Sequence, residues 1–94
     1  MSGTPPEPFD PSRPWGLHPQ VVLRPEPFGA LAYNYGNRRL TFLRDPELVD
    51  LVEGLASHAS AEAALDASAI DERRRPVMRR SLAALAATEV IRER

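Results

Sequence analysis

The stretch over residues 34–43 constrains the fold of this chain most, because it has the pattern of a tight β-hairpin. Gly36 and Asn37 form a predicted two-residue loop between two β-prone runs, and the glycine supplies the positive φ that a type II′ turn requires. We therefore predict strands over residues 29–35 and 38–43.

This loop fixes which side chains share a face of the predicted hairpin. Residues opposite each other on an antiparallel pair point to the same face, and the face changes with every residue. The bulky face, which we predict to cover the core, consists of Leu31, Tyr33, Tyr35, Leu40 and Phe42. The other face is thin and mostly polar, with Ala30, Ala32, Asn34, Arg39, Thr41 and Leu43.

The second hairpin strand is predicted to lie at the edge of its sheet, because the chain after Leu43 has helical patterns. An edge strand has unpaired N–H and C=O groups that another extended chain can bind. Capture of a peptide is therefore the first functional hypothesis.

One further strand precedes the hairpin. Residues 21–24 are β-branched or apolar apart from Arg24, and they lie between Pro19 and Pro25, as in an edge strand. Together with the hairpin they predict a three-stranded antiparallel meander.

Three helices are predicted after the strands. The first begins after Asp45, which is an N-cap acceptor followed by a proline and an acid. Ser60 can cap a second helix over residues 61–67, and the third begins near Arg75, because Pro76 fits only in the first turn of a helix. The inward-facing residues are predicted to be Leu48, Leu51, Val52, Leu55, Leu65, Met78, Leu82 and Leu85.

A run of strands followed by a run of helices predicts an α+β fold, with the three helices packed on one face of the meander. Val90 and Ile91 can return as a short extended end against the core. The proline-rich residues 1–14 are expected to be a flexible tail, and residues 15–94 the domain, with Trp15 closing one end of the core.

Composition limits the function classes. With 94 residues and a net charge of −1, the chain is one small domain without general attraction to nucleic acid or an anionic membrane. The absence of cysteine excludes disulfides, thiolate metal sites and thiol nucleophiles. No apolar run approaches the roughly 20 residues of a membrane span, and no signal-peptide pattern is present, so we expect a cytoplasmic protein.

No motif predicts catalysis, a cofactor or a metal. His18 and His58 are far apart, without other ligands at metal-binding spacing. Ser57, His58 and Asp50 are residue types of a catalytic triad, but the chain lacks a nucleophile elbow and an oxyanion-hole glycine pattern. The five glycines are scattered, so no phosphate loop is present. We therefore expect a protein that is not an enzyme and needs no cofactor.

Five arginines crowd the predicted start of the third helix: Arg73, Arg74, Arg75, Arg79 and Arg80. Cations at a helix N-terminus oppose the helix dipole, which costs about 0.3–1 kcal/mol per exposed charge. One interpretation is a solvated charged face. The other is a set of guanidinium groups that bind carboxylates of a partner, to which arginine offers a bidentate fork.

Three segments resemble a known family: residues 13–21 (RPWGLHPQV), 23–31 (LRPEPFGAL) and 38–43 (RRLTFL). They resemble the MftB-type peptide chaperones of the mycofactocin system, a branch of the PqqD-like RiPP recognition elements. The likeness covers roughly residues 9–91, and the RPEPFGA segment is typical of that branch. PqqD-like domains commonly have a glycine near the end of the last helix, where this chain has Thr88 and Glu89.

The resemblance implies a winged-helix-like fold of three strands and three helices with a non-catalytic function. It implies that the protein binds the leader of a ribosomally made precursor peptide (MftA-like) as an added strand and presents it to a radical SAM maturase (MftC-like). It also implies peptide contacts on the third strand and third helix, at Arg39, Leu40, Thr41, Phe42, Leu43, Arg75, Met78, Arg79 and Leu82.

Two alternatives stay open at this point. A winged-helix protein could bind nucleic acid through its third helix, although a DNA-binding domain normally has a basic excess over its whole surface. The edge strand could instead pair with a second copy, so the free protein is expected to be a monomer or a strand-mediated dimer.

Overall fold

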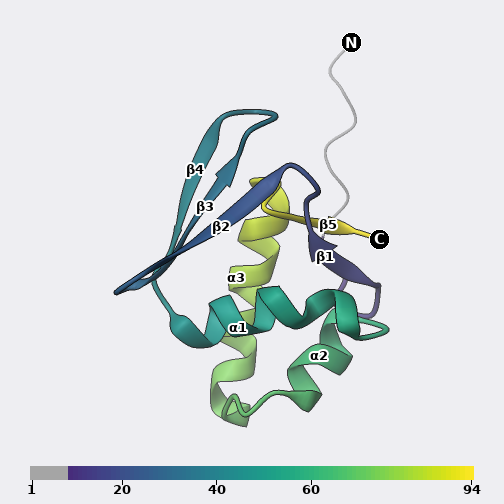
Figure 1. Cartoon of the computed structure of the whole chain (residues 1–94). Coiled ribbons are helices and arrows are strands. Elements are labelled where there is room, and N and C mark those ends of the chain that lie inside the picture. The colour runs from purple at the N-terminus through teal and green to yellow at the C-terminus, as the bar shows by residue number, and fades with distance from the viewer. Residues whose placement is uncertain (1–8) are drawn as a thin grey trace.

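The computed structural model describes residues 9–94, in which a three-stranded sheet lies beside a group of helices (Figure 1). The strands β2 (Val21–Glu26), β3 (Gly29–Asn34) and β4 (Arg39–Leu43) follow one another in the sequence and in the sheet, and both pairs are antiparallel. The predicted α+β fold and its meander are confirmed, and β4 lies at an edge of the sheet, as predicted.

A second, two-stranded sheet joins the two ends of the described chain. The strand β1 (Trp15–Leu17) pairs antiparallel with β5 (Ile91–Glu93), and the Arg94 N–H donates to the Pro14 carbonyl (2.9 Å). The sequence predicts the extended end near Ile91 but not its partner β1, because three residues are too few for an alternating pattern. The predicted tail over residues 1–14 lies partly outside the described residues, and its flexibility stays a prediction.

The helices follow the main sheet in the predicted order. They are α1 (Pro46–Gly54) with the 3₁₀ turn η1 (Leu55–Ser57), α2 (Ala61–Ala67), the 3₁₀ turn η2 (Glu72–Arg74), and α3 (Arg75–Ala87). Across the described part of the chain, none of them has the length and apolar character to span a membrane.

The helices begin at the predicted residues. The Asp45 side chain accepts the N–H of Glu47 (2.9 Å), and Ser60 Oγ accepts the N–H of Ala63 (3.0 Å). Pro76 lies in the first turn of α3, where the N–H that proline lacks would have no partner within the helix. The predicted inward-facing residues of the three helices are all buried.

The main sheet buries the face opposite to the one predicted. The predicted register is confirmed, with Leu31 opposite Phe42 and Tyr33 opposite Leu40. The buried side chains, however, are Ala30, Ala32, Asn34 and Leu43, whereas Tyr33, Leu40 and Phe42 are exposed. The alanines let the helices approach closely, so that the large side chains of the helices fill the core and the large side chains of the sheet are left outside.

The β3–β4 turn also differs from the prediction. It spans four residues, and Arg38 rather than Gly36 has a positive φ (63°). The Asn34 Oδ1 atom accepts the N–H groups of Gly36 (2.9 Å) and Asn37 (3.1 Å), which fixes the turn from within. Four-residue hairpin loops of this kind are built around a type I turn and do not need a left-handed glycine at their start.

Candidate functional site

The candidate site lies on β4, at the edge of this strand that faces away from β3. Within residues 9–94, β3 is the strand that pairs with β4, and the backbone hydrogen bonds of turns and loops do not involve residues 39–43. An open strand edge binds another extended chain through its main-chain groups.

The hydrogen-bond pattern identifies which backbone groups face this edge. The Tyr35 N–H donates to the Gln20 carbonyl (2.9 Å), so the odd-numbered residues of β3 direct their backbone groups toward β2. Successive residues of a strand face opposite edges, so the even-numbered residues of β3 face β4. In the observed register these pair with Arg39, Thr41 and Leu43, which leaves the N–H and C=O groups of Leu40 and Phe42 directed outward.

The five predicted strand residues therefore lie together but have different surroundings. The side chains of Leu40 and Phe42 are on the outer face of the sheet, with exposed fractions of 58% and 55%. Leu43 is buried in the core, Thr41 is half-buried, and Arg39 is exposed on the inner face. The side chains of one short strand can thus contact a partner on both faces of the sheet.

The four predicted helix residues lie elsewhere. Met78 and Leu82 are fully buried among the core residues. Arg75 and Arg79 face α2, where Arg75 Nη1 is 2.7 Å from Asp66 Oδ1. The structure thus does not bring these side chains to the open edge of β4.

Arg79 forms a bidentate ion pair within the chain. Its Nε and Nη2 atoms donate to the carboxylate of Glu62 on α2 at 2.9 and 2.6 Å. These hydrogen bonds lower the pKa of Glu62 and raise the pKa of Arg79, against a smaller opposing effect of burial. The arginine cluster therefore serves in part to hold α3 against α2.

Contacts at both ends of α3 place the helix alongside β4. Arg74, just before α3, pairs with Asp45 and Glu47, directly after β4. At the other end, Asn34 Nδ2 donates to the Glu89 carbonyl (3.0 Å) beside the β3–β4 turn. Between these two contacts, the helix therefore runs in the direction opposite to β4.

One flank of α3 continues from Arg74 at helical spacing. Val77, Ser81 and Ala84 follow Arg74 at i+3, i+7 and i+10, so they lie on the same side of the helix. Val77 is 45% exposed, and the other two side chains are small. These three residues are not among those predicted from the sequence, where the arginines are the more conspicuous feature. Their i+3 and i+4 spacing is the signal that could have identified them.

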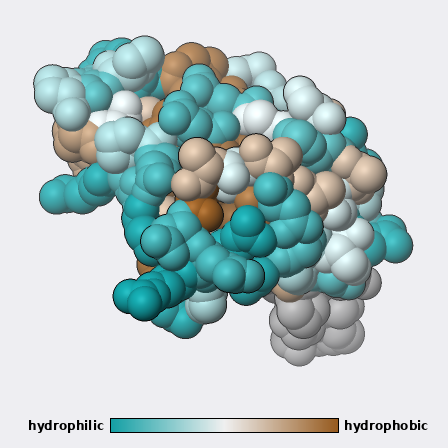
Figure 2. All heavy atoms as spheres, turned by 90° about the horizontal axis from the view of Figure 1, so that it is seen from below, coloured by the Kyte–Doolittle hydropathy of each residue, from teal (hydrophilic) through white to brown (hydrophobic). Residues whose placement is uncertain are grey.

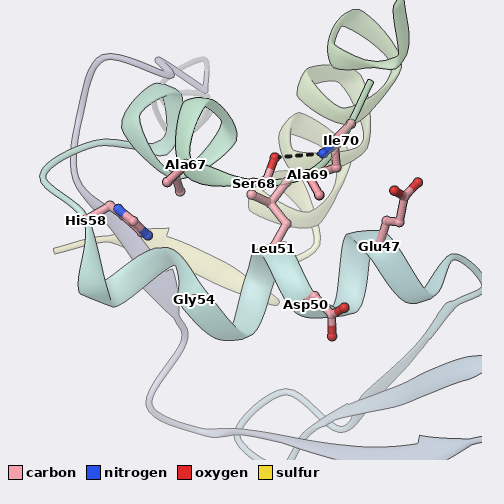
Figure 3. A pocket seen from close by; sticks show the side chains of 10 residues that line it. Glu47, Asp50, Leu51, Gly54, His58, Ala67, Ser68, Ala69 and Ile70 are labelled. Atoms are coloured by element: carbon pink, nitrogen blue, oxygen red, sulfur yellow. Dashed lines mark hydrogen bonds between the residues drawn. The ribbon is translucent and has the colours of Figure 1, made fainter. Parts of the chain in front are cut away.

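A cavity of about 260 Å³ lies between α1 and α2, away from the predicted site residues. Figure 3 shows Glu47 and Asp50 on α1, with His58 across from Ser68–Ile70. Seen from below, brown apolar atoms near the centre of the face adjoin paler, weakly apolar atoms above and hydrophilic atoms below (Figure 2). Across residues 9–94, no group of three or more His, Cys, Asp or Glu side chains could hold a metal ion.

Comparisons with known proteins agree on one family. The profile of the Peptide chaperone MftB family matches residues 14–92. The chain is 40% identical over 83 residues to the peptide chaperone MftB of Mycobacterium ulcerans, which covers 88% of this chain and 76% of that protein. It is 46% identical over 71 residues to the peptide chaperone MftB of Mycolicibacterium smegmatis, which covers 74% of this chain and 70% of that protein. No solved structure matches the chain.

Proposed function

This chain belongs to the peptide chaperone MftB family, and we propose that it captures the leader of a ribosomally synthesised precursor peptide (MftA-like) as a fourth strand on β4. It then presents the peptide to a radical SAM maturase (MftC-like) in mycofactocin biosynthesis, without catalysis of its own. The observation that carries this proposal is the unpaired edge of β4.

The main chain supplies the affinity in this proposal. Leu40 and Phe42 together offer two N–H donors and two C=O acceptors at a spacing that matches an extended peptide. A peptide of six to ten residues held in this way reaches a Kd of about 1 μM or below, equivalent to roughly −8 kcal/mol or stronger.

Side chains supply the selectivity. Inward-facing residues of the peptide would lie between the inner face of β4, near Arg39 and Thr41, and the α3 flank of Val77, Ser81 and Ala84. Met78 and Leu82 would support this flank from the core. The ion pairs of Arg75 and Arg79 with α2 favour a structural role for these two residues.

Proline at position 40 tests strand addition directly. Leu40→Pro removes an N–H that faces the open edge, so we expect at least a tenfold loss of affinity for the leader, with the fold retained. Leu40→Ala is the matched control, because it removes the same side chain and keeps the N–H. Fluorescence anisotropy with a labelled leader peptide gives both Kd values, and circular dichroism confirms folding.

Thr41→Pro is the comparison at a neighbouring position of β4 whose backbone groups face the opposite edge. The Thr41 N–H faces β3, so this variant should be less stable than wild type. It keeps the backbone groups that face the open edge. If folded Leu40→Pro binds the leader as tightly as Leu40→Ala does, then strand addition to β4 is wrong. Size-exclusion mass at several protein concentrations reports separately whether β4 pairs with a second copy.

A further inference from the structure

The outer face of the main sheet carries most of the exposed apolar surface of the described chain. Six of its seven exposed large hydrophobic side chains belong to β2–β4 or the turns between them, and the seventh is Val77 on α3. We call the following residues the outer patch: Val22, Phe28, Leu31, Tyr33, Leu40 and Phe42.

The outer patch is continuous across the three strands. Val22, Tyr33 and Leu40 form one cross-strand row in the observed register. The next row places Leu31 beside Phe42, whose ring is 5.8 Å from that of Phe28. Contiguous exposed apolar surface of this kind marks an interaction site in soluble proteins, and aromatic residues are enriched in such interfaces.

The rim of the outer patch is mainly positive. The Arg44 guanidinium lies 5.4 Å from the Phe42 ring centroid, and Arg38 is exposed in the β3–β4 turn. Arg24 lies on the same face, next to Glu26, whose carboxylate it contacts at 2.8 Å. The complementary surface is therefore apolar at its centre and carboxylate-rich at its rim. A second copy fits poorly, because a two-fold dimer through this face would bring arginines of the two rims together.

We propose that the outer patch docks the enzyme that modifies the captured peptide, through an apolar surface of that enzyme ringed by carboxylates. The identity of this partner rests on the proposed function. The patch stays accessible when the peptide is bound, because the peptide uses the edge of β4 and the inner face.

The bound peptide becomes part of the docking surface. Its outward-facing residues lie beside the side chains of Leu40 and Phe42, at the border of the outer patch. The enzyme therefore contacts the chaperone and its substrate together, and the leader increases the affinity of the chaperone for the enzyme. By thermodynamic linkage, the enzyme increases the affinity for the leader by the same factor.

Charge substitutions in the outer patch on strands other than β4 test this proposal. Val22 is on β2, two strands away from the open edge of β4, so Val22→Glu should leave leader binding within twofold of wild type. The same variant should weaken binding of the radical SAM maturase encoded in the same genome by at least tenfold. Tyr33→Glu provides an independent second variant, and Ala59→Glu introduces the same charge at an exposed site outside the patch.

Surface plasmon resonance with immobilised chaperone and purified maturase, with and without leader peptide, measures these effects, and thermal melts confirm folding. If folded Val22→Glu and Tyr33→Glu bind the maturase as wild type does, the docking surface is wrong. A wild-type dimer that Val22→Glu converts to a monomer would instead assign the patch to self-association and overturn the proposal. Failure of wild-type protein to bind the leader would contradict the proposed function separately.

Discussion

Asn34 organises the β3–β4 turn and joins it to α3. It is the buried polar residue of the described chain, with 3% of its surface exposed. Its Oδ1 accepts two turn N–H groups, and its Nδ2 donates to the Glu89 carbonyl. A buried amide with three partners is stabilising only while all three are present, because each unsatisfied buried group costs about 1–3 kcal/mol.

Replacing Asn34 should therefore cost more stability than replacing a neighbouring residue of the turn. We expect Asn34→Ala to lower the free energy of unfolding by about 2 kcal/mol or more, because three backbone groups lose their partner. Asn37→Ala is the control in the same turn, since Asn37 is exposed and should cost about 1 kcal/mol or less. Urea denaturation followed by circular dichroism compares them, and equal losses would contradict the assigned role of Asn34.

The ion pair between Glu62 and Arg79 predicts a pH-dependent contribution to stability. The folded-state pKa of Glu62 is lowered, chiefly by its hydrogen bonds from Arg79. The contribution is therefore present above the ordinary glutamate pKa of about 4.3 and is lost as the pH falls through the lowered value. Both side chains are about a third exposed, so solvent screening limits the effect to roughly 0.2–1 kcal/mol.

At pH 7, Glu62→Gln should have a free energy of unfolding that is lower than that of wild type by this amount. In acid, the two free energies should converge. Glu53→Gln, at an exposed site on α1, controls for the general loss of a carboxylate. Unfolding free energies measured between about pH 2 and 7 give both curves. A difference that persists unchanged at the acid end would show that the Arg79 ion pair is not its cause.

At the scale of the elements, capping residues made the start of the helices predictable from the sequence. The buried face of the sheet was not predictable in this way. Asp45 and Ser60 act through local hydrogen bonds, so their positions in the sequence fix where helices begin. The strand register followed from alternation in the same way. Which face is buried depends on how closely a distant helix approaches, and small residues such as Ala32 decide that only in three dimensions.

In the candidate site, too, features set by the local sequence were predictable, and features set by distant contacts were not. Sequence alone identified β4 as an edge strand, because helical patterns follow it. It did not identify which side of α3 faces β4, since that side is set by contacts of Arg74 and Glu89 with residues far away in the chain. Apolar side chains that are left outside the core, such as Phe42, were for the same reason assigned to the core.

The backbone just after α3 is strained at one residue, and a single substitution can relieve this strain. Glu89 follows the helix C-cap with φ of 62°, a left-handed conformation that costs a non-glycine residue about 1–2 kcal/mol. We expect Glu89→Gly to raise the free energy of unfolding by about 0.5–1 kcal/mol, because part of the relief is offset by the greater freedom of the unfolded chain. The backbone carbonyl that Asn34 contacts is retained.

Ala87→Gly is the matched control, because position 87 has regular helical geometry. There the same type of substitution should destabilise by about 0.5–1 kcal/mol. Chemical denaturation of the two variants should thus give changes of opposite sign. A loss of stability in Glu89→Gly would show that its side chain contributes more than its strained backbone costs.

For the whole molecule, the distribution of charge separates peptide binding from nucleic-acid binding. Three of the five clustered arginines form ion pairs within the described chain, which leaves Arg73 and Arg80 without one there. With two unpaired arginines in this cluster, duplex binding through α3 should give a slope of log K against log salt no steeper than about −1.8, at 0.9 per phosphate contact. The net charge of −1 provides no further attraction.

We therefore predict weak duplex binding that disappears near physiological salt, and leader binding that persists there. Anisotropy titrations of a labelled duplex and a labelled leader, between about 50 and 200 mM salt, provide the comparison. Tight, sequence-dependent duplex binding beside an inactive leader would favour the nucleic-acid alternative.

The pairing of β1 with β5 has a consequence for synthesis of the chain in the cell. Val90 and Ile91 fill the core near Trp15, so the interior cannot close until these late residues have left the ribosome. The three strands of the main sheet emerge long before that, including the open edge of β4. A nascent or stalled chain therefore offers a strand edge while its core is still exposed, which is the condition in which edge-to-edge aggregation occurs.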